Sequence, residues 1–237
     1  MIRINLISGP RNISTALMYS FAQRADTTVL DEPYYAFYLN TSGADHPGKE
    51  EVLKSQPLKE DDVSKMIFGP WGTDVLFIKN MAHHLEVMDP SFLEKVKNIF
   101  LIRNPRQIIA SYAQVIHTPI MRDLGIEYQH MLFNRLRAKG QQPIVIDSGL
   151  ILENPESVLQ QVCELVGIPF SKDMLHWKPG AKAYDGVWAN HWYANVHRSS
   201  GFEKQPTSNR PLPDHLIDLN AKAQNYYGEL LPFSLHA

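Results

Sequence analysis

The chain has 237 residues, of which 44% are hydrophobic and 20% are charged, and its formal net charge at pH 7 is −2. This is an ordinary globular composition, and the length suffices for one sizeable α/β core. The near-neutral charge argues against nucleic acid as a partner, so any anion site must come from a local arrangement of side chains.

The N-terminal segment is predicted to be a short strand that runs straight into a loop, without the longer apolar region and cleavage site of a signal peptide. No apolar run approaches the roughly 18 to 20 residues that span a bilayer. The single cysteine, Cys163, lies in an amphipathic stretch and is expected to be a buried thiol, which fits a reducing compartment. We therefore expect a cytoplasmic protein, monomeric or homodimeric, with no membrane partner.

Five short apolar runs, rich in β-branched and aromatic residues, alternate with stretches of helical periodicity. The runs cover residues 2–7, 27–30, 75–78, 99–102 and 144–146. Such alternation predicts an α/β fold with a mostly parallel central sheet covered by helices on both faces. In such sheets ligands bind beyond the carboxyl ends of the strands, in the loops that lead into the helices.

Helical periodicity and helix-end signals place helices at about residues 14–24, 105–115, 120–138, 154–166 and 213–226. Residues 41–62 are polar and hold two glycines and two prolines, so they are expected to form an irregular surface insertion. Residues 173–210 hold three of the four tryptophans but show weak periodicity, which indicates an irregular, partly ordered region. No repeat or composition break divides the chain, so residues 1–237 are expected to form a single domain.

The loop between the first strand and the first helix has the residues of an anion site. Gly9 allows unusual backbone angles, Pro10 stiffens the loop, and Arg11 offers a guanidinium fork that matches phosphate or sulfate oxygens. Ser14 and Thr15 offer hydroxyls at the helix start, where free amides and the helix dipole attract an anion. The loop lacks the second glycine and the lysine of a Walker A motif, and no G-x-G-x-x-G pattern occurs. The simpler alternative is a turn capped by Ser14.

The fourth predicted strand ends in a second group of candidate anion ligands. Arg103 falls at the carboxyl end of that strand, and Ser111 follows eight residues later, two turns into the next helix. That serine lies on the helix face that can look back toward the strand end, so the two side chains can grip one phosphate together. The alternative is a solvated arginine and a surface serine.

The first loop resembles the phosphosulfate-binding loop of the sulfotransferases that use PAPS (3′-phosphoadenosine 5′-phosphosulfate). The family's pattern is roughly proline, lysine or arginine, a small residue, glycine, serine or threonine, and threonine. This chain carries at those positions, in order, Pro10, Arg11, Asn12, Ile13, Ser14 and Thr15. The resemblance implies that the loop from Gly9 to Thr15 holds the 5′-phosphosulfate.

The second group resembles the 3′-phosphate motif of the same family, in which an arginine and a serine bind that phosphate. Here those positions are Arg103 and Ser111. A strand, an acidic residue, a helix and a Gly-Ile-Pro turn follow in the family's order, so the likeness covers about residues 3–170. It implies a three-layer P-loop NTPase-like fold, PAPS as the donor of a sulfuryl group to a hydroxyl or amine of a small-molecule acceptor, and no metal.

Sulfuryl transfer needs positive charge near the leaving phosphate and a group that deprotonates the acceptor. Arg11 is the candidate for the first role. Glu32 directly follows the second strand and is similar to a glutamate thought to be the base in some sulfotransferases. The alternative for Glu32 is one half of an acidic pair that the dipole favours at a helix start.

A second candidate base lies after the third strand. Lys79 matches a family lysine there, but Met81 stands where cytosolic members have their catalytic histidine. His83 or His84 would then have to reach the site from further along the chain. Their imidazoles suit proton transfer at neutral pH. Solvated or structural roles are the alternative, and with no second cluster at ligand spacing a metal is not expected.

Late in the chain, Arg198 and Ser199 have a distant likeness to the family's basic loop for the 3′-phosphate, although aromatic packing is an equal alternative. Two other functions stay open. One is a Mg²⁺-dependent phosphotransferase on the same fold, against which the missing Walker lysine counts. The other is a non-catalytic nucleotide- or anion-binding protein, favoured by the replaced glycine and histidine. The acceptor is not defined by the sequence.

Overall fold

The computed structural model describes residues 1–112, 118–204 and 211–237. Its centre is a five-stranded sheet in the order β2-β3-β1-β4-β5, and every pair of neighbouring strands is parallel. The predicted parallel sheet is therefore confirmed, with each strand within a few residues of its expected bounds. The strands are β1 (Ile2–Ser8), β2 (Thr27–Asp31), β3 (Val75–Met81), β4 (Lys97–Ile102) and β5 (Ile144–Asp147).

The sheet is buried on both faces because successive residues of each strand enter different hydrophobic clusters. In β3, Leu76 and Ile78 pack into one cluster, whereas Val75 and Phe77 pack into the other. This is the period-two alternation of a strand, with both sides apolar. It explains why the strands appear in the sequence as continuous hydrophobic runs.

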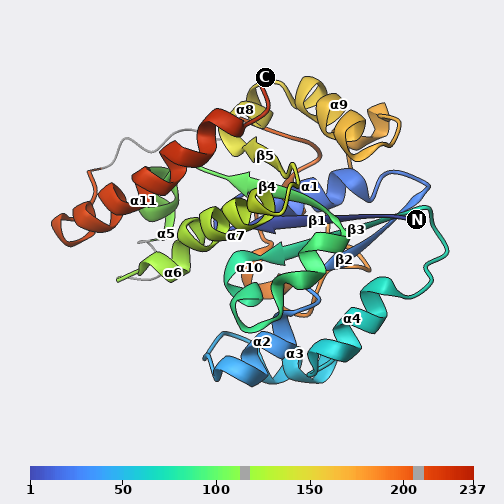
Figure 1. Ribbon diagram of the computed structural model, residues 1–237, viewed down its shortest axis with the longest axis horizontal. Helices are drawn as coiled ribbons and strands as arrows, with labels where there is room; N and C mark the ends of the chain where they lie inside the picture. Colours follow the sequence, from blue (N-terminus) through green and yellow to red (C-terminus); the bar gives the residue numbers. More distant parts are fainter. Residues whose placement is uncertain (113–117, 205–210) are drawn as a thin grey trace.

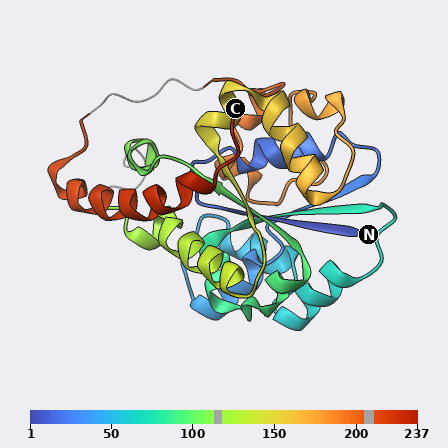
Figure 2. The ribbon, with the colours of Figure 1, turned by 45° about the horizontal axis from the view of Figure 1, so that its top comes forward.

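Helices cover both faces, as Figure 2 shows with α1 and α9 on one side of the sheet and α4 and α7 on the other. The first face holds α1 (Ser14–Phe21), α8 (Ser148–Glu153) and α9 (Pro155–Val166), with Cys163 buried as expected. The second holds α4 (Glu60–Phe68), α5 (Pro105–Tyr112), α7 (Ile126–Ala138) and α11 (Ile217–Leu230). The expected end of α5, near residue 115, lies outside the described residues.

The strand order also locates the crevice for a ligand. From β1 the chain continues to β2, at one edge of the sheet, and from β4 it continues to β5, at the opposite edge (Figure 1). The loops that follow these two neighbouring strands therefore diverge, and ligands in open α/β sheets bind at such a switch point. Both segments that the sequence singled out for anion binding begin here.

The helix expected over residues 120–138 is divided at Gly125. A four-residue helix, α6 (Met121–Leu124), ends there, and α7 begins at the next residue. Gly125 has a φ of +72°, a left-handed conformation that glycine adopts without strain. Periodicity continues across the break, so the sequence pattern alone did not reveal it.

The expectation that residues 41–62 are irregular was wrong. They contain α3 (Lys49–Ser55), and their two ends belong to α2 (Tyr35–Ser42) and α4. Val52 of α3 is 0% exposed and packs in a third, smaller cluster with Tyr35 and Trp188. With a single buried residue, α3 has no apolar stripe for the sequence to display. Its first turn instead carries Glu50 and Glu51, which favour the positive end of a helix.

The region expected to be irregular, residues 173–210, is largely irregular over its described part, residues 173–204. Its short elements are η3 (Lys172–Leu175), α10 (Ala189–Trp192) and η4 (Val196–Arg198). The last helix, α11, is preceded by a single 3-10 turn, η5 (Asp214–Leu216). None of the helices in the described ranges has both the length and the apolar character needed to cross a membrane.

Candidate active site at the carboxyl edge of the sheet

The loop after β1 presents the open N-terminal end of α1. Ile13 is the N-cap residue, and its hydrocarbon side chain cannot accept a hydrogen bond from the first turn. Asn12 holds the loop in place. Its side chain accepts a hydrogen bond from the amide of Ile13 at 3.0 Å and donates one to the carbonyl of Leu101 at 3.1 Å. The amide-rich, electropositive end of α1 is thus held beside β4.

Arg11 joins the two segments predicted to bind anions. Its Nε donates to the hydroxyl of Ser111 at 3.0 Å, and its own carbonyl accepts from Nη1 of Arg103 at 2.5 Å. Arg11 has a φ of +54°, which is strained for a residue with a side chain and is found mostly at functional turns. The structure therefore brings Arg11, Arg103 and Ser111 into direct contact.

The two guanidinium groups lie close enough to repel each other. Burial lowers the pKa of Arg103, and the charge of Arg11 lowers it further, while Asp147 opposes the shift. Among the ion pairs found in the described residues, none involves Arg11 or Arg103. Two partly buried cations without a carboxylate partner make a site that a polyanion would stabilise.

Two glycines let the loop lie against the break between α6 and α7. A Cβ atom on Gly9 would lie 2.3 Å from the carbonyl oxygen of Leu124, which is too close for any side chain. The Cα of Gly9 would itself lie 3.3 Å from a Cβ on Gly125. Gly9 was predicted for its backbone freedom, but this close approach is the physical reason for glycine here.

Gln129 of α7 ties the ends of β1 and β4 together. Its side-chain amide donates to the carbonyl of Ile7 at 2.8 Å and to that of Leu101 at 3.0 Å. These carbonyls belong to the next-to-last residues of the two strands, just before the segments that carry Arg11 and Arg103, and the Gln129 side chain is buried. The sequence gives no sign of this residue, because a lone glutamine on an amphipathic helix has no distinctive pattern.

A second group of polar side chains lies at the ends of β2 and β3 and is fully buried. The Nζ atom of Lys79, 1% exposed, donates to Asp31 at 2.9 Å, to Glu32 at 2.5 Å and to the hydroxyl of Tyr193 at 2.6 Å. Tyr193 in turn donates to Asp31 and accepts from the indole of Trp188 at 3.1 Å. The aromatic C-terminal region thus closes over this cluster.

Glu32 and Lys79 in this cluster have shifted pKa values, for different physical reasons. Burial raises the pKa of Glu32 to about 7, although the nearby charge of Lys79 opposes the shift. Burial by itself would lower the pKa of Lys79, but the charges of Asp31 and Glu32 raise it well above its ordinary value. Lys79 therefore stays cationic, and Glu32 is a carboxyl group that changes its protonation near neutral pH.

His83 and His84 lie in η1 (Ala82–Val87), directly after β3. The Nδ1 atom of His84 is 3.6 Å from a carboxylate oxygen of Glu32, and its ring stacks on Tyr35 with centroids 4.2 Å apart. Burial lowers the pKa of His83 to about 3 and that of His84 well below its usual range. Both imidazoles are neutral at physiological pH and are weak proton acceptors.

Arg198 and Ser199 form local contacts. Arg198 donates to Asn195, and Ser199 accepts from the indole of Trp177 at 3.2 Å and donates to the carbonyl of Val196 at 2.8 Å. Within the described residues, no hydrogen bond or ion pair joins either of them to Arg103 or Ser111. The same region contributes Tyr193 and Trp188 to the Lys79 cluster, a long-range contact that the sequence does not reveal.

Comparison with known sequences identifies the family. A family model described as "Sulfotransferase domain" matches residues 2–231. The chain is also 36% identical over 232 residues to the branched-chain-amino-acid aminotransferase-like protein 1 of Arabidopsis thaliana, a match that covers 97% of this chain and 42% of that protein. The chain spans about two fifths of the length of the curated relatives it matches.

Solved structures agree on the fold. The sulfotransferase domain from the curacin biosynthetic pathway superposes with a TM-score of 0.57 at 16% identity, over 98% of both chains. Mouse sulfotransferase SULT7A1, solved in complex with PAP, superposes with a TM-score of 0.50 at 12% identity, over 97% of this chain and 82% of that one. The predicted three-layer P-loop NTPase-like architecture is thereby confirmed. Because the family model matches almost every residue, this chain belongs to the sulfotransferase domain family.

Proposed function

We propose that this protein is a PAPS-dependent sulfotransferase that acts on a hydroxyl or amine of a small-molecule acceptor. The observation that carries the proposal is the contact between the two anion-binding segments, in which Arg11 bonds Ser111 and Arg103 bonds the Arg11 carbonyl. Membership of the sulfotransferase domain family supports it. A relative in fold, mouse SULT7A1, was crystallised with PAP, the product that PAPS leaves after transfer.

The donor carries phosphate groups at two positions of one nucleoside, and the residues on this edge of the sheet suit both. The loop amides, the α1 terminus, the hydroxyls of Ser14 and Thr15 and the guanidinium of Arg11 would hold the 5′-phosphosulfate. Arg103 and Ser111 would hold the 3′-phosphate. Burial, and then the charge of Arg11, lower the pKa of Arg103, and an anion that bridges the two arginines would offset both effects.

The transfer conserves atoms and charge in one displacement. A lone pair of the acceptor oxygen or nitrogen forms a bond to sulfur, and the bond from sulfur to the bridging oxygen of the 5′-phosphate breaks. The acceptor proton passes to a base on the protein, and PAP leaves with the electron pair of the broken bond. Arg11 stabilises the charge that develops on the leaving phosphate, where a fixed cation has its largest effect.

We infer that Glu32 is the base. A general base works best when its pKa is near the operating pH, and the pKa of Glu32 is raised to about 7, whereas that of His83 is lowered to about 3. The hydrogen bond from Lys79 orients the Glu32 carboxylate at the end of β2. Arg198 and Ser199 are left outside the proposed donor site, since their polar groups are engaged locally.

Calorimetric titration with PAP tests the donor site. The intact chain should bind PAP, and Arg103→Ala should weaken binding by about 10- to 100-fold, because a hydrogen bond to a charged group contributes about 1.5–3 kcal/mol. Arg135→Ala, which removes an exposed arginine of α7, is the matched control and should bind like the wild type. Absence of PAP binding by the intact chain, or equal affinity for both variants, would contradict the proposal.

A further inference from the structure

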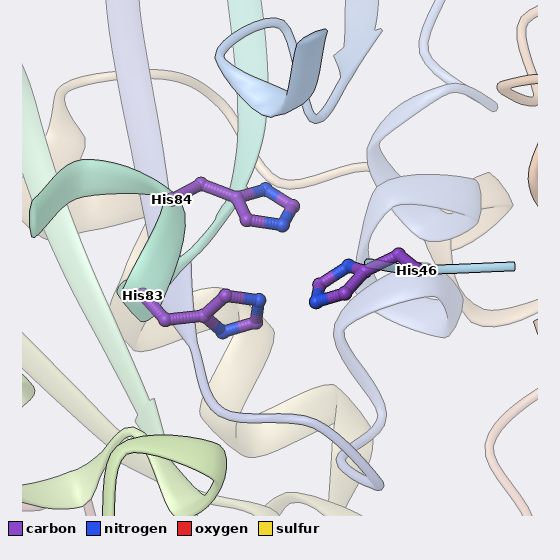
Figure 3. Close-up of side chains that lie close together, drawn as sticks. All are labelled: His46, His83 and His84. Carbon is purple, nitrogen blue, oxygen red and sulfur yellow. The ribbon is translucent and has the colours of Figure 1, made fainter. Parts of the chain in front are cut away.

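Three imidazoles from separate parts of the sequence meet beside the Lys79 cluster. His46 lies between α2 and α3, in the segment expected to be irregular, while His83 and His84 follow β3. One ligand nitrogen from each lies within 4.8 Å of the other two. In Figure 3 the three rings surround a common point, and each directs a ring nitrogen toward the others.

The outer nitrogens of two rings are oriented by neighbours. The Nδ1 atom of His46 is 2.8 Å from the hydroxyl of Tyr35, which leaves its Nε2 atom for the cluster. The Nδ1 atom of His84 faces the carboxylate of Glu32 at 3.6 Å, and the His84 ring is stacked against Tyr35 and Tyr38. Hydrogen-bond acceptors behind an imidazole are the usual support for a histidine that binds a metal.

Charged side chains of both signs lie near the three rings. The positive charge of Arg122 would repel a cation bound by the three rings, but its guanidinium is paired with the carboxylate of Glu86 at 2.6 Å. The charges of Asp45 and Asp123 favour positive charge at His46.

Packing alone leaves a buried polar atom of this cluster without a hydrogen-bond partner. Within the described residues, the Nδ1 atom of His83 is buried and has no hydrogen-bond partner. A buried polar group without a partner destabilises the fold. The presence of three adjacent imidazoles in one aromatic cluster therefore requires a reason other than packing. A ligand bound by all three rings would supply that reason.

We propose that His46, His83 and His84 bind one divalent transition-metal ion of the zinc type, with a fourth position left to water or another ligand. Nitrogen ligands and near-tetrahedral geometry suit Zn²⁺, and three-histidine sites are known for it. Ligand nitrogens about 2.05 Å from a tetrahedral ion are about 3.3 Å apart, so small ring rotations would close the present spacing. The site would fasten the loop between α2 and α3 to the end of β3.

The experiment uses the whole chain, stripped of metal with a chelator and free of any histidine tag. Titration with Co²⁺ should give visible absorption bands of a tetrahedral complex, and calorimetry with Zn²⁺ should give one ion per chain. His46→Ala should weaken Zn²⁺ binding more than about tenfold. His176→Ala, which removes an exposed histidine outside the cluster, should bind Zn²⁺ as the wild type does.

A gentler variant keeps the test decisive if His46→Ala fails to fold. Tyr35→Phe removes only the hydroxyl behind His46 and should weaken Zn²⁺ binding by about 10- to 100-fold. Absence of Zn²⁺ binding by the wild type, or unchanged binding in both variants, would overturn the metal site. Because PAP binding rests on Arg103, the PAP titration separates failure of the metal site from failure of the proposed function.

Discussion

The carboxyl edge of the sheet holds two polar regions of opposite construction. At the ends of β1 and β4, Arg11 and Arg103 are partly buried beside each other, and no carboxylate pairs with either in the described chain. At the ends of β2 and β3, Lys79 is completely buried and bonded to two carboxylates and a tyrosine. In the described residues, the two arginines of the first region have no carboxylate partner, whereas the lysine of the second region has two.

This difference separates the roles of the charged residues. A binding site for an anion must keep its cations available, so it carries a repulsion that the rest of the fold has to stabilise. A scaffold cluster has its charges compensated within the chain, and it resists the loss of any partner. Substitution in the first region should therefore affect ligand binding, and substitution in the second should affect stability.

The largest effect is expected for Lys79→Met, which keeps the apolar stem and removes the charge. Asp31 and Glu32 would remain buried without their cation, so the free energy of unfolding should fall by about 3–5 kcal/mol, as for a broken buried ion pair. Urea unfolding followed by circular dichroism measures this. Arg103→Ala should change the same quantity by less than about 1 kcal/mol.

A double variant sharpens that prediction. Asp31→Asn added to Lys79→Met removes one of the two unpaired carboxylates, so it should recover part of the lost unfolding free energy. If Lys79→Met is as stable as the wild type, the cluster at the ends of β2 and β3 is not a scaffold, and the comparison between the two regions fails.

The next effect concerns Glu32, which belongs to the buried cluster but is proposed to act on the acceptor. Glu32→Gln keeps the shape and should lower turnover of labelled PAPS by about 10²- to 10⁴-fold, because a general base contributes about that much. A base must be deprotonated, so wild-type turnover should rise with pH through about 7 and then level off. The variant should lose this dependence.

Two controls decide the assignment of the base. Glu32→Gln should bind PAP with unchanged affinity, which shows that the donor site is intact. Glu127→Gln, an exposed carboxylate of α7, should retain both turnover and the rise with pH. A Glu32→Gln variant that keeps the pH dependence would transfer the role to another group.

The smallest effect is expected for Ser111→Ala. Its hydroxyl accepts a hydrogen bond from Arg11 and would donate one neutral hydrogen bond to the 3′-phosphate, so its loss should weaken PAP binding by only about fivefold, which corresponds to about 1 kcal/mol. Calorimetry with PAP measures the change, and the unfolding free energy should be unaffected. A loss of affinity as large as that for Arg103→Ala would contradict a role for Ser111 limited to one neutral hydrogen bond with the 3′-phosphate and one with Arg11.

The sheet and the anion-binding segments could be predicted because their signals are local. Continuous apolar runs indicated all five strands, and the arginines were found from their places directly after two of these runs. Parallel strands bring such positions to one edge, so the contact between Arg11 and Arg103 followed from the topology. Helix α3 was missed because one buried residue, Val52, leaves no periodic pattern.

Side chains brought in by tertiary packing could not be predicted. His46 lies in a polar stretch far from His83 and His84 in the sequence, so the pair alone gave no reason to expect a metal ligand set. Tyr193 reaches Asp31 and Lys79 from an irregular region without periodicity. Such contacts depend on how long loops return to the sheet, which local propensity does not determine.

The bridge that Gln129 makes between β1 and β4 has a consequence for selectivity. One amide holds the carbonyls of the next-to-last residues of both strands, so α7 helps to set the separation of the two arginine-bearing loops from outside the loops themselves. An anion that touches both loops must match that separation with its own two charged ends. A substitution of Gln129 should therefore change which anions fit between the two loops.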